Sequence, residues 1–104
     1  MYKIEYLTSA INDMLEIVRY ISHKLNNPTS AIELAQEFVD SATNLNLFPY
    51  ANTVYIPIKP LKYEYRKLLV KNYVMFYWID EEKKCITIAR VIYNKRNYNS
   101  NILE

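Results

Sequence analysis

The sequence contains no glycine, and it has only one cysteine and one histidine among its 104 residues. Phosphate-binding loops of the Walker and Rossmann kinds need glycine, because their backbone must approach the phosphate closely and adopt positive φ. Those nucleotide-binding folds are therefore excluded. Without glycine, tight turns are expected to use asparagine, which tolerates the left-handed region better than most side chains.

The single cysteine and the single histidine do not form a catalytic or metal-binding pattern. Cys85 cannot form an internal disulfide and has no neighbouring His or Cys at metal-ligand spacing, so we interpret it as a small core residue. His23 lies beside Lys24 in a predicted helix, far in sequence from Cys85. We therefore expect neither a nucleophilic triad nor a metal site, and no cofactor.

Long hydrophobic runs are also missing. No apolar stretch approaches the roughly 18 residues that a membrane span requires, and the N-terminal "MYKIEYLTSA" lacks the basic-then-apolar layout of a signal peptide. About half of the residues are apolar (51%), which is enough to build one core. We expect a cytoplasmic protein with a single domain over residues 1–104 and no membrane contact.

Charge is distributed unevenly along the chain. Residues 1–58 carry three basic and six acidic residues, whereas residues 59–98 carry ten basic and four acidic residues. The second half is compatible with an anionic partner. An ordinary soluble surface explains the same excess, and the composition does not choose between them.

The first half of the chain predicts a strand followed by two helices. Residues 2–7 alternate between polar and apolar, which indicates a short strand. Thr8 or Ser9 is expected to cap a helix that ends near Asn26. Asn27 and Pro28 are typical of the cap and first position of a second helix. The apolar stripes are predicted at Ile11, Leu15, Val18, Ile21 and Leu25 in the first helix, and at Ala31, Leu34, Ala35, Phe38, Val39, Ala42 and Leu45 in the second.

The second half predicts three strands after a long connection. Residues 48–60 contain three prolines and no clear period, so we expect a surface connection. Residues 63–70, 73–79 and 85–93 are rich in β-branched and aromatic side chains. The resulting order β-α-α-β-β-β predicts an α+β domain with a helical hairpin packed on a mainly antiparallel four-stranded sheet.

Metal-free phosphate chemistry is the catalysis that these residues could support. RNA cleavage of this kind needs a base for the 2′-hydroxyl, a proton donor for the leaving oxygen and cations around the phosphate. Lys, Arg and Tyr can fill these roles, and residues 63–71 and 90–98 combine them. Alternating Lys and Tyr are equally typical of a soluble sheet face, so a binding surface and a plain scaffold remain open.

The order of elements and the last third of the chain together resemble a known family, the RelE/ParE toxins of bacterial type II toxin-antitoxin pairs. The stretches that carry the resemblance are "YKIEYLTSAINDMLEIVRYI", "NNPTSAIELAQEF", "LNLFPY" and, most sharply, "EYRKLLVKNYVMFYWIDEEKKCITIARVIYNKRNY". No single motif is diagnostic, but the joint match in order and spacing is specific.

The resemblance implies a growth-inhibiting toxin that a cognate antitoxin neutralises. RelE-like members cut mRNA on the ribosome without a metal, whereas ParE-like members inhibit DNA gyrase without being enzymes. The antitoxin is expected to dock on exposed strips of the helical hairpin and on the basic sheet face, and to have an acidic binding tail. An inactive relative that only binds its antitoxin is a third possibility.

The resemblance also assigns roles to residues. For an mRNA endonuclease, the candidate catalytic residues are Arg66, Tyr93, Arg96 and Tyr98, and the candidate nucleic-acid-binding residues are Lys67, Lys71, Arg90 and Lys95. Two positions depart from the nuclease pattern. Val74 stands where RelE-like nucleases usually place an Arg, and Tyr93 stands where many relatives have a His. Both departures favour the gyrase alternative, which needs a docking surface instead of a catalytic set.

Overall fold

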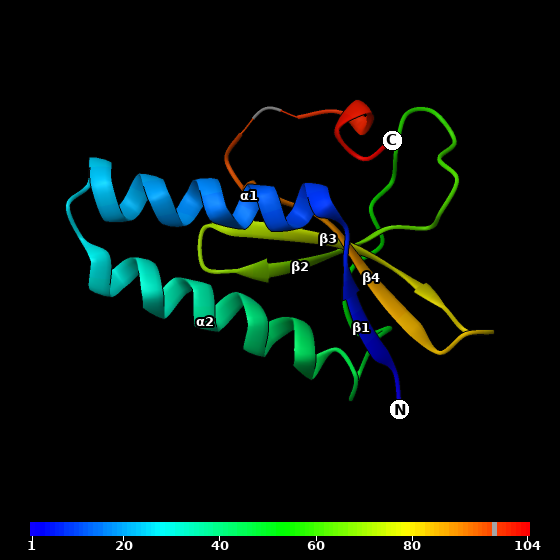
Figure 1. The fold of residues 1–104 in the computed structure, drawn as a ribbon. Coiled ribbons are helices and arrows are strands. Elements are labelled where there is room, and N and C mark those ends of the chain that lie inside the picture. The colour runs from blue at the N-terminus through cyan, green and yellow to red at the C-terminus, as the bar shows by residue number, and fades with distance from the viewer. Residues whose placement is uncertain (97) are drawn as a thin grey trace.

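The structure, a computed structural model, describes residues 1–96 and 98–104 (Figure 1). Its strands are β1 (Lys3–Tyr6), β2 (Arg66–Val70), β3 (Tyr73–Asp80) and β4 (Cys85–Tyr93). Its helices are α1 (Thr8–Arg19), which continues as a π-helical turn (Tyr20–Lys24), then α2 (Pro28–Asn44) and a short 3-10 helix (Ser100–Ile102). The predicted order β-α-α-β-β-β is confirmed. Residue 97, within the predicted basic-aromatic segment 90–98, lies outside the described residues.

The four strands form one sheet in the order β1-β4-β3-β2. β1 is parallel to β4, with Lys3 opposite Cys85, and the other two pairs are antiparallel. The sheet is therefore mainly antiparallel, as predicted. β1 pairs with β4 only as far as Ile88, because the chain then leaves the sheet to begin α1.

The sheet is covered on both faces, which explains why β3 is almost continuously apolar. Met75 and Tyr77 belong to the cluster that packs under the helical hairpin, whereas Val74 and Phe76 belong to a second cluster on the opposite face. We call this opposite face the helix-free face. It is covered by the connection between α2 and β2 and by the C-terminal segment. Alternate side chains of a strand point to opposite faces, so a buried strand between two layers has no polar side.

The predicted start of α2 is confirmed. The Asn27 side chain accepts a hydrogen bond from the Ser30 backbone N–H (3.2 Å), and Pro28 occupies the first helical position. Most of the predicted stripe is buried, but Val39 is exposed. α1 and α2 lie side by side as an antiparallel hairpin (Figure 1).

Two predictions about α1 are wrong. Leu7 occupies the cap position without a side-chain hydrogen bond, and the Ser9 hydroxyl instead donates to the Ala89 carbonyl in β4 (2.7 Å). The predicted stripe is also wrong in part, since Ile11, Leu15 and Leu25 are exposed, although the predicted Ile21 does pack against the core. The residues that pack against the core are Ala10, Met14, Ile17 and Ile21. Both sets have helical spacing, so the period alone could not identify the buried face.

The predicted strand 63–70 begins later than expected, at Arg66. Its outer edge is covered at this end by the preceding connection, where Val54 forms a bridge with Arg66 and the Lys67 N–H donates to the Thr53 carbonyl (2.9 Å). No helix in the described part of the chain is long and apolar enough to cross a bilayer.

Candidate functional site

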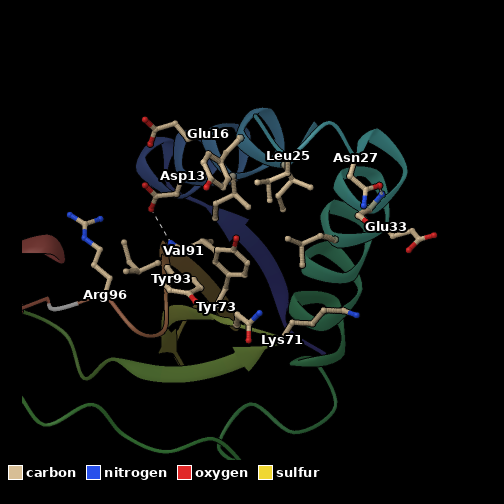
Figure 2. Close-up of a pocket in the computed structure, with 17 residues that line it drawn as sticks. Asp13, Glu16, Leu25, Asn27, Glu33, Lys71, Tyr73, Val91, Tyr93 and Arg96 are labelled. Carbon is tan, nitrogen blue, oxygen red and sulfur yellow. Dashed lines mark hydrogen bonds between the residues drawn. The ribbon is translucent and has the colours of Figure 1, made fainter. Parts of the chain in front are cut away.

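A groove opens between the turn of the helical hairpin and the tip of the sheet formed by the β2–β3 turn and the end of β4 (Figure 2). Its volume is about 910 Å³. The walls come from α1, the π-helical turn, the first turns of α2 and the end of β4. The side chains that make its floor apolar and aromatic include Ile17, Ile21, Leu34, Tyr73, Val91 and Tyr93.

Tyrosine rings form one side of the groove. The Tyr73 ring packs edge to face against Phe38 and Tyr93, with centroid separations of 5.6 and 5.7 Å. Burial raises the pKa of the Tyr73 phenol, and the neighbouring Tyr93 raises this pKa further. The phenol is therefore neutral in the physiological range. Such a surface offers apolar ring faces with polar tips, which suits the side chains of a protein segment.

Charged side chains of both signs surround this floor. Glu16 and Glu33 come from the helices, and Lys71 and Arg96 come from the sheet side (Figure 2). The Lys71 ammonium lies 3.6 Å from the Glu37 carboxylate, but both side chains are largely exposed, so the pair is weak. The rim can therefore contact a partner of mixed charge, and it is not a concentrated phosphate site.

Three of the sequence-predicted residues meet at this groove, namely Lys71, Tyr93 and Arg96. The backbone fixes their positions, because the Asn94 N–H donates to the Asn72 carbonyl (2.7 Å) and the Arg96 N–H donates to the Tyr93 carbonyl (2.9 Å). The end of β4 is thereby tied to the β2–β3 turn.

Arg90 has other partners. Its guanidinium donates to both carboxylate oxygens of Asp13 in α1 (2.6 and 2.9 Å) and to the Ile102 carbonyl (2.9 Å). The Asp13 carboxylate also accepts from the Val91 N–H (2.9 Å). The hydrogen bonds to Asp13, which exceed the opposing effect of burial, raise the pKa of Arg90. This arrangement connects α1, β4 and the C-terminal segment, so Arg90 positions these elements.

The structural role of Asp13 was not predicted from the sequence. Asp13 is buried on the inner face of α1, among apolar neighbours. The signal was available, because a carboxylate among apolar positions of a helix requires a cationic partner. The sequence did not say which of the many Lys and Arg residues that partner was.

Tyr98 lies on the helix-free face. Its ring packs against Phe76 and Tyr55, with centroid separations of 5.4 and 6.4 Å. Burial, followed by the neighbouring Tyr55, raises the pKa of the Tyr98 phenol. Lys67 is opposite Phe76 in the β2–β3 register, so its side chain projects from the same face. Tyr98 and Lys67 are therefore separated from Tyr93 by the thickness of the sheet.

Arg66 lies at the other end of β2 from the groove. Its guanidinium donates to the carbonyls of Tyr50 and Asn52 (3.1 and 2.8 Å) and lies over the Tyr50 ring at 5.0 Å. It also contacts the Glu64 carboxylate at 3.4 Å. Arg66 lies four residues before Val70, which is beside the groove, a distance of roughly 13 Å along the strand. Arg66 thus fixes the connection that precedes β2.

The eight candidate residues are therefore distributed over separate places. Lys71, Tyr93 and Arg96 line the groove, Lys67 and Tyr98 lie on the helix-free face, and Arg66 and Arg90 hold structural contacts. Lys95 is exposed beside the groove without lining it. Among the described residues, no group of three His, Cys, Asp or Glu side chains could hold a metal ion.

The sequence matches the family model described as the ParE toxin of the type II toxin-antitoxin system, parDE, over residues 4–98. The chain belongs to this toxin family. The position that departs from the RelE-like nuclease pattern, Val74, is fully buried in this ParE-family chain and packs in the cluster of the helix-free face. An arginine there would need room and a counter-charge that this apolar cluster lacks.

Solved structures of related systems have the same fold. The chain is similar to a protein of the chromosomal ParDE system from Pseudomonas aeruginosa, with a TM-score of 0.69, 17% identity and coverage of 89% of this chain and 96% of that one. It is similar to a chain of the archaeal RelE–RelB complex from Pyrococcus horikoshii, with a TM-score of 0.60, 13% identity and coverage of 92% and 98%. The isolated RelE toxin of Escherichia coli gives a TM-score of 0.52 at 15% identity, with coverage of 93% and 88%. At these identities the likeness shows the fold, and no curated protein sequence matches the chain.

Proposed function

We propose that this ParE-family chain is a growth-inhibiting toxin which a cognate antitoxin neutralises, and that it acts by binding DNA gyrase without cleaving RNA. The observation that carries this choice is the dispersal of the candidate catalytic residues. Tyr93 and Arg96 lie at the groove, Tyr98 lies on the opposite face, and Arg66 lies at the far end of β2.

Metal-free cleavage requires its base, acid and cations within hydrogen-bond reach of one phosphate. Arg66 is held by Tyr50 and Asn52, and Arg90 is held by Asp13 and Ile102, so neither guanidinium is free to surround a phosphate. A binding inhibitor has no such requirement, because it needs a surface that fits its target.

The groove is the proposed docking site for the antitoxin. Proteins of the P. aeruginosa ParDE system and the P. horikoshii RelE–RelB complex share this fold and are named for toxin-antitoxin pairs. An amphipathic segment could place apolar side chains against Ile21 and Tyr73 and acidic side chains near Lys71 and Arg96. This arrangement supports an antitoxin segment of mixed apolar and acidic character.

The decisive experiment compares two activities of the purified chain. We expect it to inhibit supercoiling by DNA gyrase and to accumulate cleaved DNA complexes, while mRNA in a translating extract stays intact. Addition of the cognate antitoxin should restore supercoiling. Cleaved mRNA together with unaffected gyrase would contradict the proposal, and absence of any growth arrest on expression would identify an inactive relative.

Ribosome-dependent mRNA cleavage is the second candidate, and one observation favours it. Lys67 and Tyr98 both lie on the helix-free face around Phe76, so a cation and a phenol share one surface there. If cleavage occurs on this face, it should be lost in Tyr98→Phe and Lys67→Ala, whose folds should be intact by circular dichroism. Cleavage that survives both substitutions would exclude these residues from catalysis.

A further inference from the structure

Two isoleucine side chains project from the connection that precedes β2. Ile58 is 96% exposed and Ile56 is 80% exposed, which makes them the most exposed large apolar side chains after Met1. Isoleucine is among the residues most often fully buried in folded proteins. We call residues 56–60, which contain both side chains, the isoleucine prong.

The prong is fixed at both ends. On one side the Tyr55 N–H donates to the Tyr65 carbonyl (2.8 Å), and its ring packs against Phe76. On the other side the Lys62 N–H donates to the Glu104 carboxylate (2.8 and 3.0 Å). Pro57 and Pro60 restrict the backbone between these anchors. A segment restricted in this way loses little conformational entropy when it binds a partner.

The two charged side chains within residues 56–62 are both lysines. Lys59 and Lys62 are exposed and form no ion pair among the described residues. Two acidic side chains lie nearby and both have partners: Glu64 contacts Arg66 at 3.4 Å, and the Glu104 carboxylate accepts from the Lys62 N–H and the Tyr65 phenol. The prong therefore presents two apolar side chains bordered by ammonium groups. Its complement is an apolar cleft with carboxylates at the rim.

The prong and the groove lie at opposite ends of the molecule. In Figure 1 the green segment that contains the prong runs beside the C-terminus, whereas the hairpin turn that forms the groove lies at the other end. An antitoxin segment in the groove would leave the prong uncovered. The prong is therefore suited to a different partner from the one that fills the groove.

We infer that the isoleucine prong is the part of the toxin that contacts its protein target, inserting Ile56 and Ile58 into an apolar cleft bordered by carboxylates. This inference rests on the proposed function, because it assumes that toxicity comes from binding a protein. It assigns the target contact to the connection and leaves the groove to the antitoxin.

The test uses a double variant, Ile56→Ser with Ile58→Ser, and the matched control Ile32→Ser. Ile32 is 69% exposed on α2 and lies outside both the prong and the groove. We expect the double variant to need at least about tenfold more protein for half-inhibition of gyrase, because each buried isoleucine contributes roughly one to two powers of ten to affinity. The control should inhibit like the wild type. Both proteins should keep the circular dichroism spectrum and the antitoxin affinity of the wild type.

A second variant tests the charges. Lys59→Glu with Lys62→Glu should weaken inhibition, and the wild-type inhibition should weaken as salt is raised. If the double isoleucine variant inhibits gyrase as well as the wild type, the inference is overturned. It is also overturned if the variant loses antitoxin binding, or if the wild type sediments with vesicles of phosphatidylcholine and phosphatidylglycerol through the same isoleucines.

Failure of the proposed function gives a different result. If the wild type arrests growth but leaves gyrase unaffected, the gyrase assignment is wrong, and growth arrest replaces supercoiling as the readout for the same variants. Loss of arrest in the double variant alone, with mRNA intact, would still support the prong. Arrest that is equal in all variants, or no arrest by the wild type, would overturn it.

Discussion

Asp13 lies on the buried side of α1, where its carboxylate supplies a hydrogen-bond acceptor to the edge of the sheet at β4. β1 stops pairing with β4 at Ile88, so the backbone of β4 beyond that point has no strand on this side. The Asp13 carboxylate takes the place of the missing strand by accepting from the Val91 N–H, and it also pairs with Arg90. The Asp13 carboxylate thus pairs with both a buried backbone N–H and the positive charge of Arg90.

Removing this carboxylate is expected to destabilise the fold. Asp13→Ala leaves the Arg90 charge and the Val91 N–H without their partner, and should lower the free energy of unfolding by about 2–3 kcal/mol. The cost stays below that of a fully enclosed pair because the Arg90 side chain is 23% exposed. Urea denaturation measures the change. The control Glu64→Ala removes a largely exposed partner of Arg66 and should cost less than about 1 kcal/mol, and equal costs would contradict the argument.

The turns between elements show which residues adopt positive φ in a chain that has no glycine. Among the described residues, Asn26, Lys71 and Lys84 have φ of 51°, 52° and 52°. The expectation that asparagine takes these positions is correct at the hairpin turn and wrong at the β2–β3 and β3–β4 turns. At these two turns the left-handed position falls on a lysine, although Asn72 directly follows Lys71.

A lysine in the left-handed region is strained, and glycine at the same place is not. Lys71→Gly should therefore be more stable than Lys71→Ala by about 1 kcal/mol, since both lose the weak pair with Glu37 and only alanine keeps a Cβ. Thermal unfolding of the two variants measures the difference. A higher melting temperature for the alanine variant would show that the Cβ of residue 71 causes no strain.

At the scale of the whole molecule, one exposed carboxylate connects three distant segments. Glu81 in the β3–β4 turn accepts hydrogen bonds from the phenols of Tyr2, at the N-terminus (2.7 Å), and Tyr50, in the connection after α2. Lys84 also donates to Glu81 (2.6 Å). The hydrogen bonds from Lys84 and then from the two tyrosines lower the pKa of Glu81 to about 2, and the bond to Glu81 raises the pKa of Tyr50 to about 12.

These shifts predict a pH dependence with a definite sign. Because the folded pKa of Glu81 lies below its ordinary value of 4.5, its contribution to stability is present above pH 4.5 and is lost as the pH falls toward 2. At high pH the raised pKa of Tyr50 has the corresponding effect: the contribution of the Tyr50 phenol to stability is present below pH 10 and is lost as the pH rises toward 12. Glu81→Gln should therefore melt at a lower temperature than the wild type at pH 7.

The difference in melting temperature between Glu81→Gln and the wild type should shrink as the pH falls from 4.5 to 2. Added salt should reduce this difference at pH 7, because the cluster is exposed to solvent. Glu82→Gln, which changes the next residue in the turn, is the matched control. A pH-independent difference for Glu81→Gln would exclude the titration of Glu81 as its cause.

The sequence by itself determined the order of elements, the α+β class and the toxin family. Asn27 and Pro28 placed the start of α2, and the apolar run at 73–79 identified the central strand, because these signals depend on local backbone geometry and on burial. The sequence could not choose between the two apolar stripes of α1, since both have the same period.

Only the tertiary structure decided which charged residues are free to act. Arg66 and Arg90 look like phosphate ligands in the sequence, but the packing pairs them with backbone carbonyls and with Asp13. Tyr93 and Tyr98 are five residues apart and lie on opposite faces of the sheet. A side chain's partner depends on which segments meet in space, and this information is distributed over residues far apart in the chain.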